Sequence, residues 1–115
     1  MSQPARPRPR PERRYRRLTL RVDVRLETGG ECRRAIATTL GAGGLFVATD
    51  APLPTRTLLC VCFALPGDDE ENCLDARVAW SERPGVGVRT PGMGLEFTHA
   101  GARSALAARL EAWAD

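Results

Sequence analysis

The residues with the most distinctive chemistry lie in two short segments. Residues 12–17 read Glu-Arg-Arg-Tyr-Arg-Arg, so that Arg13 and Arg17 form an R-x-x-x-R pattern, and residues 41–44 read Gly-Ala-Gly-Gly. Arginine side chains donate paired hydrogen bonds to phosphates and to the O6 and N7 atoms of guanine, and they also stack on bases. Glycine has no Cβ atom, so a glycine-rich turn lets the backbone approach a ligand closely. Together the two segments predict a small anionic ligand that contains guanine.

Each segment also has an explanation without a ligand. All 17 basic residues are arginine, which GC-rich codon usage produces, so an R-x-x-x-R pattern arises readily by chance, and the glycines suit a tight hairpin. Codon usage does not explain where the charge lies. Residues 1–34 hold 11 arginines and 4 acidic residues, a net charge of +7, whereas residues 35–115 hold 6 arginines and 10 acidic residues, a net charge of −4. A basic arm on a mildly acidic body indicates an anionic partner.

The sequence offers little of the chemistry that an enzyme needs. His99 is the only histidine, and it lies between a predicted strand and a predicted helix, where surface or capping roles are common. The acidic run at residues 68–71 resembles a solvated loop, because no further oxygen ligands can be placed beside it. Neither a G-x-S-x-G motif nor a Walker loop occurs. We therefore expect no catalytic activity, no metal ion and no cofactor.

Four cysteines bear on the redox environment: Cys32, Cys60, Cys62 and Cys73. Cys60 and Cys62 are two residues apart in a predicted strand, which puts both side chains on the same face. A zinc site needs a second pair of ligands at suitable spacing. The N-terminal residues lack the apolar segment of a secretory signal, so we expect a cytoplasmic, reducing environment. We expect the cysteines to be small buried residues, not metal ligands or a disulfide framework.

The elements that position these residues are mostly strands. Leu18–Glu27 alternates strictly between apolar and polar residues, which is the pattern of a strand with one buried face. Leu58–Leu65 is almost wholly apolar, which predicts a strand buried on both faces. Further strands are expected at Cys32–Leu40, Leu45–Ala48, Leu74–Trp80, more weakly at Val86–Arg89, and at Met93–Phe97. Closely spaced strands with turn residues between them indicate an antiparallel sandwich or barrel.

The two ends of the chain differ from this β pattern. Residues 1–11 combine alternating Pro and Arg and are expected to form a disordered tail before a single domain at residues 12–115. Residues 102–114 contain neither Gly nor Pro, and Leu106, Leu110 and Trp113 fall on one helical face. We expect this helix to cover one side or one open end of the β body. No apolar stretch approaches the roughly 20 residues of a membrane span.

The order of these motifs resembles the PilZ domain, the bacterial receptor module for cyclic di-GMP. The similar segments are Arg13-Arg14-Tyr15-Arg16-Arg17, residues 39–47, residues 76–80 and residues 91–97. The resemblance implies a six-stranded antiparallel β-barrel closed by a C-terminal helix. It also implies a non-catalytic module whose arginine arm rearranges when the nucleotide binds. A protein partner then recognises the new surface. The ligand-binding residues that it implies are Arg13, Arg14, Arg17, Thr39, Gly41 and Gly44.

The second motif of that family, (D/N)-x-S-x-x-G, is altered in this chain. Thr39 stands at the acidic or amide position and Gly41 at the serine position, so that only Gly44 matches. A lost charge-assisted hydrogen bond costs roughly 1.5–3 kcal/mol and a lost neutral one about 1 kcal/mol. The loss of both predicts an affinity for cyclic di-GMP that is roughly 10²–10³-fold weaker.

Three functions therefore compete. The first is a receptor that still binds cyclic di-GMP, and the second is a PilZ-like adaptor that acts through protein contacts alone. The third, a nucleic-acid binder, has little support, because aromatic residues make up only 5% of the chain and no helix is basic. For Trp80 the sequence leaves two positions open, stacking on a ligand or lying in the core, and the strand face that it shares with Leu74, Ala76 and Val78 favours the core.

Overall fold

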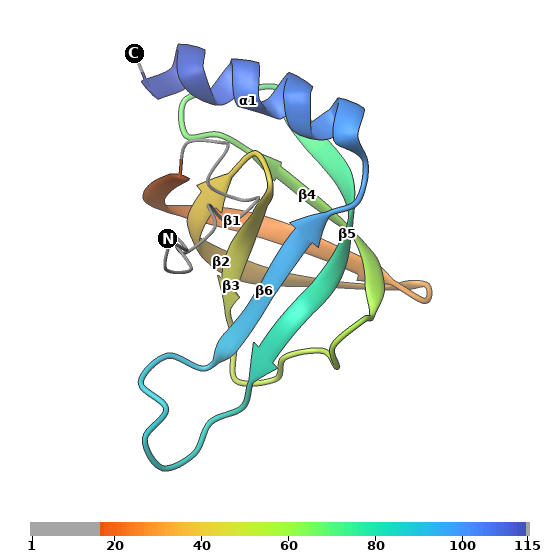
Figure 1. Ribbon diagram of the computed structural model, residues 1–115, viewed down its shortest axis with the longest axis vertical. Coiled ribbons are helices and arrows are strands. Elements are labelled where there is room, and N and C mark those ends of the chain that lie inside the picture. Colours follow the sequence, from red (N-terminus) through yellow and green to blue (C-terminus); the bar gives the residue numbers. More distant parts are fainter. Residues whose placement is uncertain (1–16, 115) are drawn as a thin grey trace, which may run out of the picture.

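Six antiparallel strands form a closed barrel, and a single helix follows them (Figure 1). The computed structural model describes residues 17–114, so the predicted tail at residues 1–11 and arm residues 12–16 lie outside the described residues. The elements are β1 (Arg17–Thr28), β2 (Glu31–Gly41), β3 (Gly44–Ala48), β4 (Leu58–Ala64), β5 (Glu71–Glu82), β6 (Gly92–Phe97) and α1 (Ala100–Ala114). Around the barrel the order is β1-β2-β3-β6-β5-β4, and β4 closes the ring by pairing with β1. The expected six-stranded barrel with a C-terminal helix is confirmed.

The alternating sequence of β1 determines which side chains fill the barrel. Val22, Val24 and Leu26 are buried in the core, while the residues between them point outward. The predicted turn after β1 is confirmed, since Gly29 and Gly30 have φ angles of 57° and 83°. Two consecutive positive φ angles suit a tight hairpin between twisted strands.

Helix α1 covers the end of the barrel at which the β2–β3 hairpin lies (Figure 1). Leu106 and Leu110 are buried in the same core cluster as the inward-facing strand residues, which confirms the predicted apolar face. The helix begins at Ala100, two residues before the expected start. The side chain of Trp113, the third residue of the predicted stripe, lies outside the described part of the chain.

An ion pair ties the helix to the loop between β4 and β5. Arg109 donates hydrogen bonds of 2.7 Å to the Asp68 carboxylate and to the side-chain oxygen of Asn72. A hydrogen bond from the backbone N–H of Glu70 and the bond from Arg109 together lower the pKa of Asp68. The negative form of Asp68 therefore stabilises the docked helix.

Two of the strand predictions need correction. The segment Val86–Arg89 forms turns and bends instead of a strand, because Gly87 adopts a φ angle of 84° that breaks an extended chain. Strand β4 is not buried on both faces. Its inward residues Leu59, Val61 and Phe63 are buried. On the outer face Leu58 is 66% exposed and Cys60 is partly exposed, although Cys62 is buried.

The expectation that the cysteines form no disulfide is also wrong. Cys62 of β4 and Cys73 of β5 lie directly opposite each other, with their Cα atoms 4.1 Å apart, and they form a disulfide on the outer face of the barrel. The spacing of 11 residues along the chain gave no sign of this contact, because only the register between the two strands brings the residues together. Cys32 and Cys60 are free thiols.

Candidate functional site

The start of β1 lies beside the glycine-rich hairpin. Arg17 is paired with Gly41, the last residue of β2, in the antiparallel register of the two strands. Opposite residues of such a pair have Cα atoms about 4.5–5.5 Å apart. Arg13 and Arg14, the other two arginines of the predicted site, lie outside the described residues. The structure thus brings Arg17 and Gly41 together at one end of the barrel.

The hairpin itself is packed against β6. Ala42 is fully buried, and the Gly43 carbonyl oxygen accepts a 2.9 Å hydrogen bond from the backbone N–H of Phe97. Gly44 is paired with Glu96, and a Cβ atom at Gly44 would collide with the carbonyl oxygen of Leu95. The glycine that matches the family motif is therefore required by the close approach of β3 and β6. This packing requirement holds whether or not the hairpin binds a ligand.

Thr39 lies on the outer face of β2, two residues before Gly41. Its register partners are Thr19 on β1 and Phe46 on β3, and the Thr39 side chain is partly exposed. Residues two apart on a strand share a face, so Thr39 and Gly41 face the same side of the sheet. The structure thus places Thr39 on the partly exposed outer face, between Thr19 of β1 and the aromatic residue Phe46 of β3.

Phe46 and Trp80 form a stacked aromatic pair on this outer face. Their ring centroids are 5.4 Å apart and their planes differ by 19°. Trp80 is 47% exposed, so the prediction of a core position is wrong. The reason is an irregular register between Val78 and Trp80, where β5 has one residue more than β6 and the side-chain alternation is reversed.

Two glycines of β6 make room for the aromatic pair. A Cβ atom at Gly94 would collide with the Trp80 indole nitrogen, and one at Gly92 would collide with the Phe46 ring. Both rings therefore pack directly against the backbone of a strand that has no side chains at these positions. The sequence signal for such an approach is Gly94 inside the predicted strand Met93–Phe97, with Gly92 just before that strand.

Comparison with known proteins identifies the family. The family model for the PilZ domain matches residues 11–113. This chain belongs to the PilZ family. The match includes the arginine arm, all six strands and nearly the whole of α1. No curated protein sequence matches the chain significantly.

Two solved structures resemble this PilZ domain in fold. The structure of the Bacillus subtilis inhibitor of motility (MotI/DgrA) superposes with a TM-score of 0.65 and 22% sequence identity, covering 83% of this chain and 47% of that one. The PilZ domain of CeSA from a cellulose-synthesizing bacterium gives a TM-score of 0.57 and 23% identity, covering 84% of this chain and 98% of that one. The present chain thus spans about half the length of the first structure, and at these identities the likeness concerns the fold alone.

The outer surface of this PilZ domain combines three kinds of group. They are the start of β1 at Arg17, the hydroxyl group of Thr39 and the rings of Phe46 and Trp80, while Gly41, opposite Arg17, is buried. Such a surface suits a planar, hydrogen-bonding anion, because it offers stacking area beside polar groups.

Within residues 17–114, no helix combines the length and the apolar character needed to cross a bilayer.

Proposed function

We propose that this PilZ domain is a non-catalytic signalling module that binds cyclic di-GMP on the outer face of its barrel and passes the signal to a protein partner in the cytoplasm. One observation carries the proposal: the backbone of β1 begins at Arg17 directly opposite Gly41, and the neighbouring strands carry Thr39 and the Phe46–Trp80 pair on their outer face. The arginine-rich segment and the glycine-rich hairpin, which are far apart in sequence, therefore meet at one place.

Each group in this surface has a role that follows from its chemistry. Arg13, Arg14 and Arg17 bind the two phosphates of the ligand, because guanidinium groups donate paired hydrogen bonds to phosphate oxygens. The Thr39 hydroxyl and the backbone around Gly41 accept and donate hydrogen bonds at the guanine edges. The exposed aromatic pair offers a surface on which a guanine stacks, an interaction that contributes about 1–3 kcal/mol per base.

A second function is supported by the altered motif. Thr39 and Gly41 lack the carboxylate or amide and the hydroxyl of the family pattern, which weakens the expected binding. A PilZ-like adaptor that binds a protein partner without the nucleotide has the same fold and needs no ligand groups at these positions. The exposed Trp80 and the partly buried Phe46 then serve as a contact for the partner, since aromatic residues are enriched in protein interfaces.

Tryptophan fluorescence separates the two functions. The chain has two tryptophans, so a Trp113→Phe background leaves Trp80 as the sole emitter. A receptor shows a saturable change in Trp80 emission when cyclic di-GMP is added, and a much smaller change with GMP, which has a single phosphate. The change disappears in an Arg13→Ala/Arg17→Ala variant. Unchanged emission from a folded domain, checked by circular dichroism, contradicts the receptor and favours the adaptor.

A further inference from the structure

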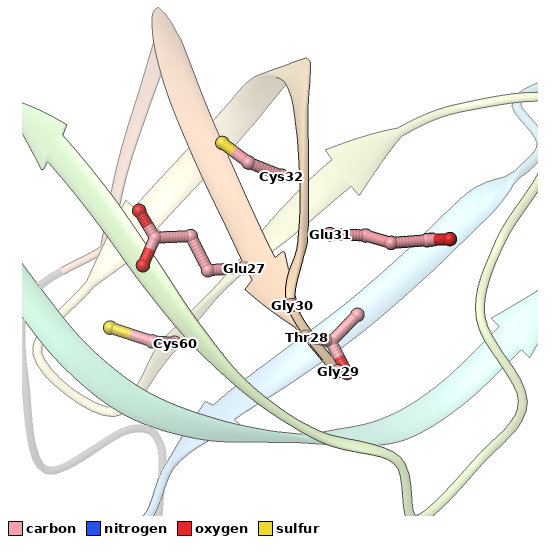
Figure 2. A pocket seen from close by; sticks show the side chains of 7 residues that line it. All are labelled: Glu27, Thr28, Gly29, Gly30, Glu31, Cys32 and Cys60. Atoms are coloured by element: carbon pink, nitrogen blue, oxygen red, sulfur yellow. The ribbon is translucent and has the colours of Figure 1, made fainter.

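Three of the four cysteines gather on the outer face of the barrel, next to an acidic side chain. Cys60 of β4 is paired with Glu27 of β1, and two residues further along β4 Cys62 is paired with Cys73 of β5. The Sγ atoms of Cys60 and Cys62 are 3.9 Å apart. One ligand atom from each of Glu27, Cys60 and Cys62 lies within 4.8 Å of the other two. Figure 2 shows Glu27 and Cys60 extending from neighbouring strands toward the same side.

These distances suit a tetrahedral metal ion. Zinc binds cysteine sulfur at about 2.3 Å, which places two sulfur ligands of a tetrahedral site about 3.8 Å apart. The separation of 3.9 Å between Cys60 and Cys62 agrees with that value. Glu27, Cys60 and Cys62 therefore place three potential ligands around one point. The sulfur of Cys73, on the next strand, is bonded to that of Cys62 and becomes available as a fourth ligand when this bond is reduced.

We propose that Cys60, Cys62, Cys73 and Glu27 form a zinc site once the Cys62–Cys73 disulfide is reduced. A dithiol reductant supplies the two electrons: its sulfurs form a new disulfide, and Cys62 and Cys73 become thiols. Zinc then binds the three cysteines as thiolates and displaces their protons to solvent. In the oxidised protein two of the four ligands are joined to each other, so the disulfide and the metal exclude one another.

Arg25 orients the carboxylate of Glu27 at this place. Arg25 Nε donates a 3.3 Å hydrogen bond to Glu27 Oε2, and Arg25 Nη1 donates a 2.9 Å bond to Glu71. The bond to Arg25 uses Oε2 and orients the carboxylate, so we assign Oε1 of Glu27 to the metal. Arg25 offsets part of the negative charge that three thiolates and a carboxylate bring to a divalent ion.

Cys32 provides a matched control. It is paired with Glu27 from the opposite side, on β2, and it is an exposed free thiol. It does not belong to the group of ligand atoms around Cys60, and Figure 2 shows the Glu27 side chain between the two cysteines. A Cys32→Ser substitution therefore removes one thiol from the same face and leaves the proposed ligands in place.

Cobalt(II) is the probe that tests the site, because its absorption spectrum reports both thiolate ligands and tetrahedral geometry. The full chain, reduced with a phosphine under nitrogen, should bind one cobalt ion with thiolate charge-transfer bands and strong visible bands, and zinc should displace it. Cys60→Ser should weaken cobalt binding by roughly 100-fold or more and Glu27→Gln by roughly 10-fold or more. Cys32→Ser and the wild type should bind equally well.

Other results overturn the proposal. They are the absence of tetrahedral bands in the reduced, folded wild type, equal binding by Cys60→Ser and wild type, and a loss of binding in Cys32→Ser. Cys60 is only partly buried and Glu27 lies on the outer face, so both variants should fold, and circular dichroism verifies this. Cobalt binding by the oxidised protein as tight as by the reduced protein also contradicts the assigned ligands.

Discussion

Replacing Thr39 with aspartate or asparagine should restore hydrogen bonds that the altered motif lacks. Thr39 lies on the outer face of β2, is partly exposed and is paired with Phe46 of β3. A longer side chain at this position therefore does not disturb the packing of the core. A charge-assisted hydrogen bond contributes about 1.5–3 kcal/mol and a neutral one about 1 kcal/mol. Thr39→Asp should therefore tighten the binding of cyclic di-GMP roughly 10- to 150-fold, and Thr39→Asn about fivefold.

The measurement is a titration calorimetry series with cyclic di-GMP on the wild type and the two variants. Thr90→Asp is the matched control, because Thr90 is exposed in the loop at residues 83–91, which lies at the opposite end of the barrel from the β2–β3 hairpin (Figure 1). This control adds the same negative charge far from the proposed site and should leave the affinity within about twofold of wild type.

The expected order of affinity is Thr39→Asp above Thr39→Asn above wild type. If both substitutions at residue 39 weaken binding or leave it unchanged in folded proteins, the guanine edge does not lie against the outer face of β2. An equal gain in affinity from Thr90→Asp would also refute the reasoning, since the effect would then not depend on where the carboxylate is placed.

Three further predictions concern stability. Leu110→Ala should lower the free energy of unfolding by about 2–5 kcal/mol in urea denaturation, because Leu110 is 1% exposed and joins α1 to the core. Gly44→Ala should cost about 3 kcal/mol or more, because its Cβ meets a backbone carbonyl of β6, whereas Gly85→Ala, with open space at that Cβ, should change stability by no more than about 0.5 kcal/mol. The lowered pKa of Asp68 predicts a stabilising effect that is present above about pH 4 and is lost as the pH falls through the folded-state pKa. Wild-type and Asp68→Asn urea midpoints should therefore differ at pH 6, and the difference should shrink as the pH falls below about 4. A constant difference would contradict the assigned interaction with Arg109.

Much of the fold followed from local patterns. The strict alternation of Leu18–Glu27 predicts β1, and the spacing of Leu106 and Leu110 predicts the buried face of α1. Each pattern arises because one element packs one of its faces against the core. The paired glycines at positions 29 and 30 likewise predicted the first hairpin. These features depend on residues that are close in the sequence, so no knowledge of strand register was needed.

The surface features depend on register and could not be predicted in the same way. Trp80 was assigned to the core by counting alternate residues, but one extra residue in β5 turns the side chain outward onto Phe46. Cys62 and Cys73 belong to two different strands, and only the pairing of β4 with β5 places them opposite each other. A shift of one residue in a strand changes the face of every following side chain, and sequence periodicity alone does not reveal such a shift.

Titration of the full chain with cyclic di-GMP by calorimetry tests the central claim most directly. The wild type should give saturable heat, and the double variant Arg13→Ala/Arg17→Ala should give none at the same concentrations. Arg83→Ala/Arg89→Ala removes the same charge from the loop at residues 83–91 and should bind as the wild type does. Absence of heat from the folded wild type, or equal binding by the arm variant, would contradict the account of the arginine arm and the glycine hairpin as the nucleotide site.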